Sequence, residues 1–140
     1  MTYWTEFVKL VDEARISCAS TLGLCWAGFA LAYLAGVRKV PLQQKLFGVF
    51  PMRSLVPGHS LMGTQNDQFL CPQSRYATLP DTAMEAAQRQ GRLRLLAHGE
   101  SVGYTIFETP DQRQLMHLGH PEYNVDRILA EMESDKARGD

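Results

Sequence analysis

The stretch LGLCWAG, residues 22–28, decides the fold of this chain. A short strand-like run, residues 19–24, ends here, and an apolar run without proline, residues 26–35, begins directly after Cys25. These patterns predict a buried strand followed by a buried helix, which Gly36 closes as a C-cap. Cys25 would then lie on the tight turn between them, either as a packed thiol or as a nucleophile.

A turn of this kind holds a side chain above the edge of a sheet, where it can react. The helix N-terminus behind Cys25 should lower the pKa of the thiol and favour the thiolate. The backbone N–H of Trp26 is placed to donate to an oxyanion. So tight a turn needs small neighbours, which Gly23, Ala27 and Gly28 supply. Taken alone, however, the local pattern favours a buried structural thiol.

The composition describes one globular domain. The chain has 140 residues, of which 45% are hydrophobic and 21% charged, with a formal net charge of −1. This balance excludes the basic footprint of a nucleic-acid-binding protein, and no signal peptide or run of about 20 apolar residues suggests a membrane partner. Three cysteines without a CxxC pattern favour a reducing cytoplasm.

The rest of the chain predicts an α/β sheet with some antiparallel strands. Helical spacing or helix-forming composition covers residues 3–16, 81–90 and 124–137, the last with Asn124 as N-cap. Strand-like runs cover residues 45–50, bracketed by Pro41 and Pro51, and residues 68–71, 93–98, 102–108 and 114–118. A turn at residues 109–113 predicts a hairpin, and residues 51–67 and 72–76 are expected as loops.

A second chemical motif is LGHPEYN, residues 118–124, which follows an apolar strand. Residues i and i+2 of an extended segment point the same way, so the Glu122 carboxylate could hold the His120 imidazole in one tautomer. The alternative is a surface histidine beside a solvated glutamate, and for this motif alone that alternative is favoured. A cysteine at one strand end and His-x-Glu at another would, however, meet at one edge of an α/β sheet. There the thiolate would attack, the imidazole would shuttle protons and the carboxylate would orient it.

Other polar residues give weaker signals. Cys18 and Cys71 are expected as packed thiols, and His59, His98 and His117 are scattered. A metal site made of Cys25, His120 and Glu122 lacks ligand-pair spacing, so no metal is expected. Lys45, Ser74 and Arg75 could bind a carboxylate or phosphate, although for each of them alone solvent exposure is favoured.

Four stretches carry a family resemblance: STLGLCWAG, PLQQKLFGVF, CPQSRY and GHPEYNVDRILAEM. In this order they resemble homoserine O-acyltransferases of the MetA type, that is, homoserine O-succinyltransferases. The resemblance runs from about Tyr3 to the C-terminus. It implies a class I glutamine amidotransferase-like (flavodoxin-like) sheet with helices on both faces.

The resemblance also implies a ping-pong acyl transfer with acyl-CoA as co-substrate and no other cofactor. Cys25 would take the acyl group from succinyl-CoA, or less favourably acetyl-CoA, and His120 beside Glu122 would deprotonate the hydroxyl of L-homoserine. Lys45 and Ser74 match the substrate-binding positions of the family. The product would be an early intermediate of methionine biosynthesis, made by a cytoplasmic enzyme that could be a homodimer.

Departures from the family pattern limit what the resemblance implies. Ser134 stands where the family has a substrate-binding arginine, so the acceptor could be another hydroxyl amino acid such as serine, unless Lys136 or Arg138 replaces that arginine. Gln73 stands where the family has histidine. The family also carries first strands and an oxyanion loop before this region, so residues 1–140 are expected to form one partial catalytic domain. A bare sheet edge and apolar face would then favour self-association.

Two alternatives remain open beside the acyltransferase. One is a cysteine amidase or glutaminase on the same fold. The other is a non-catalytic protein, or an inactive fragment of the acyltransferase, that keeps the site without the full scaffold.

Overall fold

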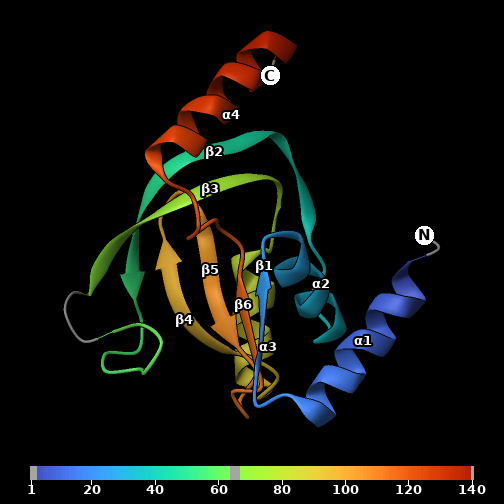
Figure 1. Cartoon of the computed structure of the whole chain (residues 1–140). Coiled ribbons are helices and arrows are strands. Elements are labelled where there is room, and N and C mark those ends of the chain that lie inside the picture. The colour runs from blue at the N-terminus through green and yellow to red at the C-terminus, as the bar shows by residue number, and fades with distance from the viewer. Residues whose placement is uncertain (1–2, 64–66, 140) are drawn as a thin grey trace.

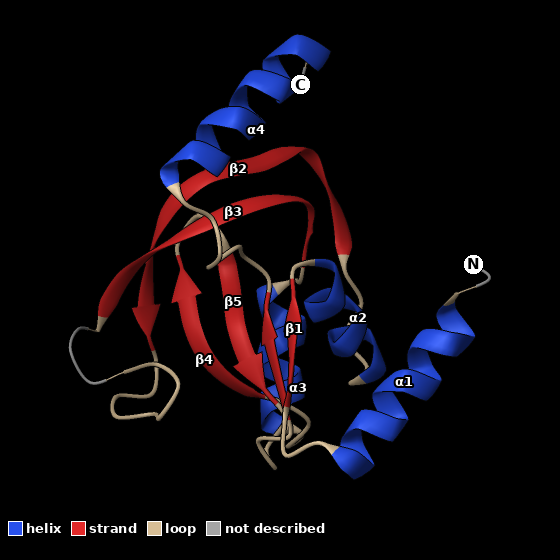
Figure 2. Cartoon of the chain, viewed as in Figure 1, coloured by secondary structure: helices blue, strands red, loops and turns tan. Residues whose placement is uncertain are grey.

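The structure, a computed structural model, describes residues 3–63 and 67–139 and consists of a curled mixed sheet with four helices around it (Figures 1 and 2). In chain order the elements are α1 (Trp4–Ser17), β1 (Thr21–Leu24), α2 (Trp26–Leu34), β2 (Val40–Ser54), β3 (Gln68–Thr78), α3 (Asp81–Arg89), β4 (Arg94–Gly99), β5 (Gly103–Glu108), β6 (Gln114–His117) and α4 (Val125–Arg138).

The strand order in the sheet is β1-β6-β5-β4-β2-β3. Strand β1 runs parallel to β6, whereas the other neighbours are antiparallel. Parallel strands end at the same edge of a sheet, so the residues that follow β1 and β6 meet there. That edge receives both Cys25 and His120.

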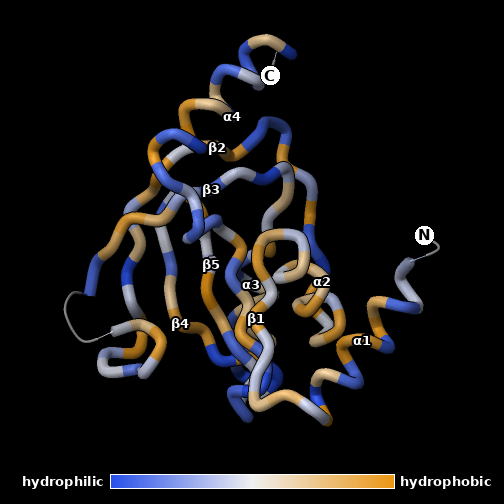
Figure 3. The backbone as a smooth tube through the Cα atoms, in the orientation of Figure 1, coloured by the Kyte–Doolittle hydropathy of each residue, from blue (hydrophilic) through white to orange (hydrophobic). Residues whose placement is uncertain are grey.

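Two hydrophobic clusters hold the sheet in place. One joins α2 and α3 to strands β4, β5 and β6 through buried side chains such as Phe29, Met84, Phe107 and Met116. The other lies within the curl of β2 and β3 and consists of Met52, Cys71, Leu96, Ala97, Val102 and Ile106. Figure 3 shows the hydrophobic character of α2 against the mixed colouring of α1 and α4, which lie at the periphery. The sheet and α2 are therefore the rigid part that positions the strand ends.

Helix α1 touches α2 through aromatic rings and has no buried residue. The ring centroids lie 5.6 Å apart for Trp4 and Tyr33 and 5.1 Å apart for Phe7 and Trp26. Within the described residues, β1 pairs on one side only, and its Leu22 is 56% exposed. The outer edge of β1 and the Leu22 side chain are therefore exposed in the described part of the chain. Across the described ranges, no helix combines the length and hydrophobicity needed to cross a membrane.

Most elements predicted from the sequence are confirmed to within a few residues. The four helices and strands β4–β6 lie where periodicity placed them, and β5 and β6 form the expected hairpin. Asn124 caps α4, because its Oδ1 accepts the backbone N–H of Arg127 at 2.8 Å. Gly36 follows α2 at φ +84°, which supports the predicted C-cap.

Strands β2 and β3 are much longer than predicted. Pro41 and Pro51 do not bracket a short strand but lie inside β2, and the expected loop 72–76 lies inside β3. The two strands pair with each other over most of their length, and the register shifts between Pro41 and Leu46. Long-range pairing overrides local propensity here, and a proline is tolerated because most of β2 pairs on one side only.

Candidate active site

Cys25 lies in a strained turn between β1 and α2. Its backbone has φ 45° and ψ −107°, a positive φ that a residue with a Cβ rarely adopts. Its N–H donates to the His117 carbonyl at 2.8 Å, which ties the turn to the end of β6. A Cβ on Gly23 would lie 2.8 Å from Leu31, and one on Gly28 would lie 3.0 Å from the Gly23 carbonyl. The predicted need for small neighbours is confirmed.

His120 is held from three directions. Its backbone N–H donates to the Pro72 carbonyl at 2.8 Å, and its Nδ1 lies 2.7 Å from Glu122 Oε1. Its ring stacks on Tyr123, with the ring centroids 4.3 Å apart. The predicted histidine–carboxylate contact is present, but its origin differs from the prediction. Residues 120–123 form a turn, closed by Tyr123 N–H on the His120 carbonyl at 3.1 Å, rather than an extended segment.

The pKa of the Cys25 thiol is raised, which contradicts the expectation that the helix N-terminus would lower it. Burial is the largest cause; the hydrogen bond from the Trp26 backbone and the charge of Arg75 lower the pKa, whereas Glu122 and Glu131 raise it further. Desolvation of the charged form outweighs the helix terminus. The resting thiol is therefore protonated at neutral pH, and a base has to remove its proton for attack.

A cavity of about 440 Å³ opens at the thiol. Its walls are Cys25, Trp26, Phe29, Lys39, Pro41, Ser74, Arg75, Tyr76 and Ala77. The Cys25 Sγ lies 3.8 Å from the Ser74 carbonyl oxygen across this cavity. The structure thus brings β1, α2 and β3 together around one sulfur atom.

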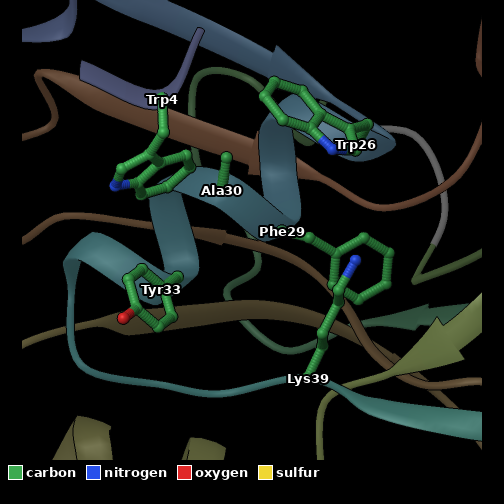
Figure 4. Close-up of a pocket in the computed structure, with 6 residues that line it drawn as sticks. All are labelled: Trp4, Trp26, Phe29, Ala30, Tyr33 and Lys39. Atoms are coloured by element: carbon green, nitrogen blue, oxygen red, sulfur yellow. The ribbon is translucent and has the colours of Figure 1, made fainter. Parts of the chain in front are cut away.

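A second hollow, of about 370 Å³, adjoins the first between α1 and α2. Figure 4 shows its walls: Trp4, Trp26, Phe29, Ala30, Tyr33 and Lys39. Trp26, Phe29 and Lys39 line both hollows. The ammonium of Lys39 lies 5.7 Å from the Phe29 ring centroid, so a cation sits above an aromatic wall.

Lys45 and Ser74 meet on the carboxylate of Glu131 in α4. Lys45 Nζ donates to Glu131 Oε1 at 2.9 Å and to Asp135 Oδ2 at 2.5 Å, and Ser74 Oγ donates to the same Glu131 oxygen. The Lys45 side chain is only 12% exposed, so the alternative of a solvated lysine is wrong. Figure 1 shows α4 lying over β2 and β3, where these contacts form. Lys45, Ser74, Glu131 and Asp135 thus form a hydrogen-bonded polar cluster next to the thiol cavity.

Acid should undo this polar cluster. Burial alone would raise the pKa of the Glu131 carboxyl. Hydrogen bonds from Ser74, Lys45 and Tyr123 outweigh this effect and lower the pKa to about 2. A carboxyl with a depressed folded-state pKa stabilises the fold above its unfolded pKa, and this stability is lost as the pH falls through the folded pKa. We expect the free energy of unfolding to fall between pH 4.5 and about pH 2, and Glu131→Gln to reduce that decline in urea titrations. A decline of equal size in Glu131→Gln would contradict this assignment.

The structure also shows contacts that sequence reasoning missed. Cys71 is buried as expected, but Cys18 is exposed, which corrects the prediction of a packed thiol. Burial lowers the pKa of His117 to about 4, and its Nε2 lies 3.9 Å from Cys71 Sγ. Glu131 gave no signal, because an i, i+4 pattern of charges on a terminal helix is ordinary for a solvated face.

Two histidines that the sequence offered as candidate site residues pair with carboxylates outside the site. His59 pairs with buried Glu108 at 3.0 Å, and His98 pairs with Asp81 at 2.9 Å. In the described ranges, no three His, Cys, Asp or Glu side chains form a group that could hold a metal ion.

The residues considered as replacements for the family arginine lie at the end of α4. Ser134 and Lys136 are exposed, whereas Arg138 pairs with Asp135 and so reaches the edge of the polar cluster around Lys45.

The family model for homoserine O-succinyltransferase matches residues 1–140. A homoserine O-acetyltransferase of Acetivibrio thermocellus is 34% identical over 140 residues, which are 99% of this chain and 45% of that protein. A homoserine O-succinyltransferase of Yersinia pestis is also 34% identical, over 99% of this chain and 44% of its own length. The chain thus spans less than half the length of these relatives.

Solved structures share the fold. A glutamine amidotransferase of Thermotoga maritima has a TM-score of 0.71 at 13% identity, over 98% of this chain and 54% of that chain. A glutamine amidotransferase of Methylobacillus flagellatus also gives 0.71, at 14% identity over 96% and 51%. These likenesses confirm the predicted glutamine amidotransferase-like fold.

Proposed function

The chain belongs to the homoserine O-succinyltransferase family, and from this premise we propose that it carries the acyl-transfer centre of such an enzyme. The family consists of transferases that differ in acyl group, since its members include both acetyl- and succinyltransferases. The proposed reaction moves the acyl group of succinyl-CoA or acetyl-CoA to the hydroxyl of L-homoserine. We assign this reaction to methionine biosynthesis and the enzyme to the cytoplasm.

The observation that carries the proposal is the pairing of two strand ends. Cys25 follows β1, His120 follows the parallel β6, and the Cys25 N–H bonds directly to the His117 carbonyl at 2.8 Å. Glu122 accepts from one imidazole nitrogen of His120, which leaves the other free to exchange protons. A cysteine with a raised pKa needs such a base.

In the proposed first step, His120 takes the thiol proton and Cys25 Sγ attacks the thioester carbonyl. The Trp26 backbone N–H donates to the oxyanion. The C–S bond to CoA breaks, and the CoA thiol leaves with the proton from His120. In the second step, His120 deprotonates the acceptor hydroxyl, which attacks the acyl-cysteine and releases the ester and the Cys25 thiol.

The neighbouring polar groups suit the two substrates. An amino acid carries a carboxylate, which Lys45 and Ser74 could bind, and an ammonium, which Glu131 and Asp135 could bind; without substrate, these four residues bind one another. The aromatic hollow of Figure 4 suits the apolar arm of an acyl-CoA, and Lys39 suits its phosphates.

Intact-protein mass after incubation with each acyl-CoA tests the proposal. We expect one acyl group to add to the wild-type chain with succinyl-CoA or acetyl-CoA, and none to add to Cys25→Ala, because the thioester forms at that sulfur. Added L-homoserine should remove the group, and L-serine provides the comparison for acceptor choice. Cys18→Ser is the matched control, since Cys18 is an exposed thiol outside the site. Equal labelling of wild type and Cys25→Ala would refute Cys25 as acyl carrier.

A further inference from the structure

Arg75 is a buried cation in the wall of the thiol cavity. The residue is only 4% exposed and lies on β3, where sequence reasoning expected a loop. Its Nε donates to Gln73 Oε1 at 3.0 Å, and its two Nη groups donate to the carbonyls of Ala77 and Val102 at 2.5 and 2.7 Å. The guanidinium is thus held rigidly by acceptors that carry no charge.

Within residues 3–63 and 67–139, no carboxylate forms an ion pair with Arg75, although other arginines do form such pairs. A buried charge is costly unless an opposite charge compensates it. Burial lowers the pKa of Arg75 to about 10, still far above neutral, so the group stays charged. The arrangement therefore calls for an anion near the cavity.

Among the described residues, the groups whose negative charge would act on Arg75 are the thiols of Cys25 and Cys71. Cys71 is joined to Arg75 through Gln73, whose Nε2 donates to Cys71 Sγ at 3.4 Å. Burial raises the pKa of Cys71 to about 11, so this thiol stays protonated. Cys25 lines the same cavity as Arg75. Its Sγ lies 3.8 Å from the carbonyl oxygen of Ser74, the residue before Arg75. Cys25 is the thiol that opens to the cavity and can lose its proton.

We propose that Arg75 is the counter-ion of the Cys25 thiolate, a positioning residue that holds a fixed positive charge beside the sulfur. The inference deepens the proposed function, because it rests on Cys25 as the nucleophile. It explains why a cation without a carboxylate partner among the described residues lines the same cavity as a nucleophile whose thiolate is otherwise disfavoured. The guanidinium offsets part of the desolvation and of the repulsion from Glu122 and Glu131, the carboxylates that raise the thiol pKa.

The test measures the reactivity of Cys25 itself and needs no acyl transfer. Alkylation by iodoacetamide, which is uncharged, reports the thiolate fraction at each pH. Cys18 and Cys25 lie in one tryptic peptide, residues 16–38, so the assay uses a Cys18→Ser background and reads that peptide by mass spectrometry. Circular dichroism verifies that each variant is folded.

Arg75→Met should slow alkylation of Cys25 by about tenfold at every pH below the thiol pKa, because an opposite charge nearby shifts a pKa by about one unit or more. Arg75→Lys, which keeps the charge, should stay within about threefold of wild type. Arg53→Met is the matched control: it removes an exposed arginine of β2 that does not line the cavity, and it should leave the rate unchanged.

Arg75→Gln replaces Arg75→Met if the latter does not fold, since its amide can still donate to the carbonyls. Equal slowing by Arg75→Lys and the neutral variant would assign Arg75 a purely structural role and overturn the inference. So would an unchanged rate in the neutral variant. A slowed rate in a chain that accepts no acyl group would support the counter-ion while the proposed function failed.

Discussion

His120→Asn should lower the rate of acyl transfer to homoserine by about a thousandfold, the middle of the range for loss of a general acid–base group. The reason is the raised pKa of Cys25: burial keeps the thiol protonated, so attack on acyl-CoA depends on a base. Asparagine is polar and smaller than histidine, so it fits the same space, and it keeps the backbone N–H bond to the Pro72 carbonyl at 2.8 Å. The fold should therefore survive while proton transfer is lost.

The measurement is the rate of O-acylhomoserine formation from pH 6 to pH 10, with acyl-cysteine formation followed separately by mass. Because the base removes the thiol proton in the first step, the defect in acyl-cysteine formation should shrink toward high pH, where the thiol ionises unaided. Glu122→Gln is the companion variant; it keeps a hydrogen-bond partner for Nδ1 at the 2.7 Å contact but loses the charge, and should lose about tenfold. A wild-type rate in folded His120→Asn would remove His120 from the mechanism.

Local chemistry could be predicted from the sequence wherever it depends on a few neighbouring residues. The small residues around Cys25 predict the turn there. The structure gives the reason, because a Cβ on Gly23 or Gly28 would lie too close to neighbouring atoms. Asn124 caps α4 as its side chain type predicts. In both cases the interaction spans a few positions along the chain, where pattern and structure are directly coupled.

Long-range pairing could not be predicted from local patterns. β2 and β3 pair along most of their length, and this pairing turns the segment 72–76 from an expected loop into a strand. Ser74 and Arg75 consequently point in different directions: Ser74 meets Glu131, whereas Arg75 is buried by the sheet. The raised pKa of Cys25 is not visible in the local pattern either, because it depends on burial in a cavity that β3 helps to line.

Gly119→Ala should destabilise the fold by about 3 kcal/mol, the upper part of the range for overpacking. A Cβ at this position would lie 2.6 Å from the Pro72 carbonyl oxygen, 2.7 Å from Cys71 Sγ and 2.8 Å from Gln73 Nε2. All three distances are shorter than any ordinary contact, and one neighbour is backbone. β3 would have to move away from the loop that carries His120, or that loop would have to leave β3.

The same displacement should reach the site. Gly119 precedes His120, whose N–H donates to the Pro72 carbonyl that a Cβ at position 119 would displace. Thermal unfolding followed by circular dichroism should show a fall in Tm of about 10 °C for a chain of this size. Activity measured well below that Tm should also fall, because His120 shifts relative to Cys25.

Gly91→Ala is the matched control, since a Cβ there meets nothing within 4 Å, while its φ of +69° carries only the ordinary strain of a left-handed residue. That strain costs about 1 kcal/mol, so its Tm should fall by about a third as much as that of Gly119→Ala. Equal shifts for both variants would mean that β3 yields freely around Gly119. In that case the close approach of β3 to the His120 loop would not be what fixes His120 beside the cysteine turn.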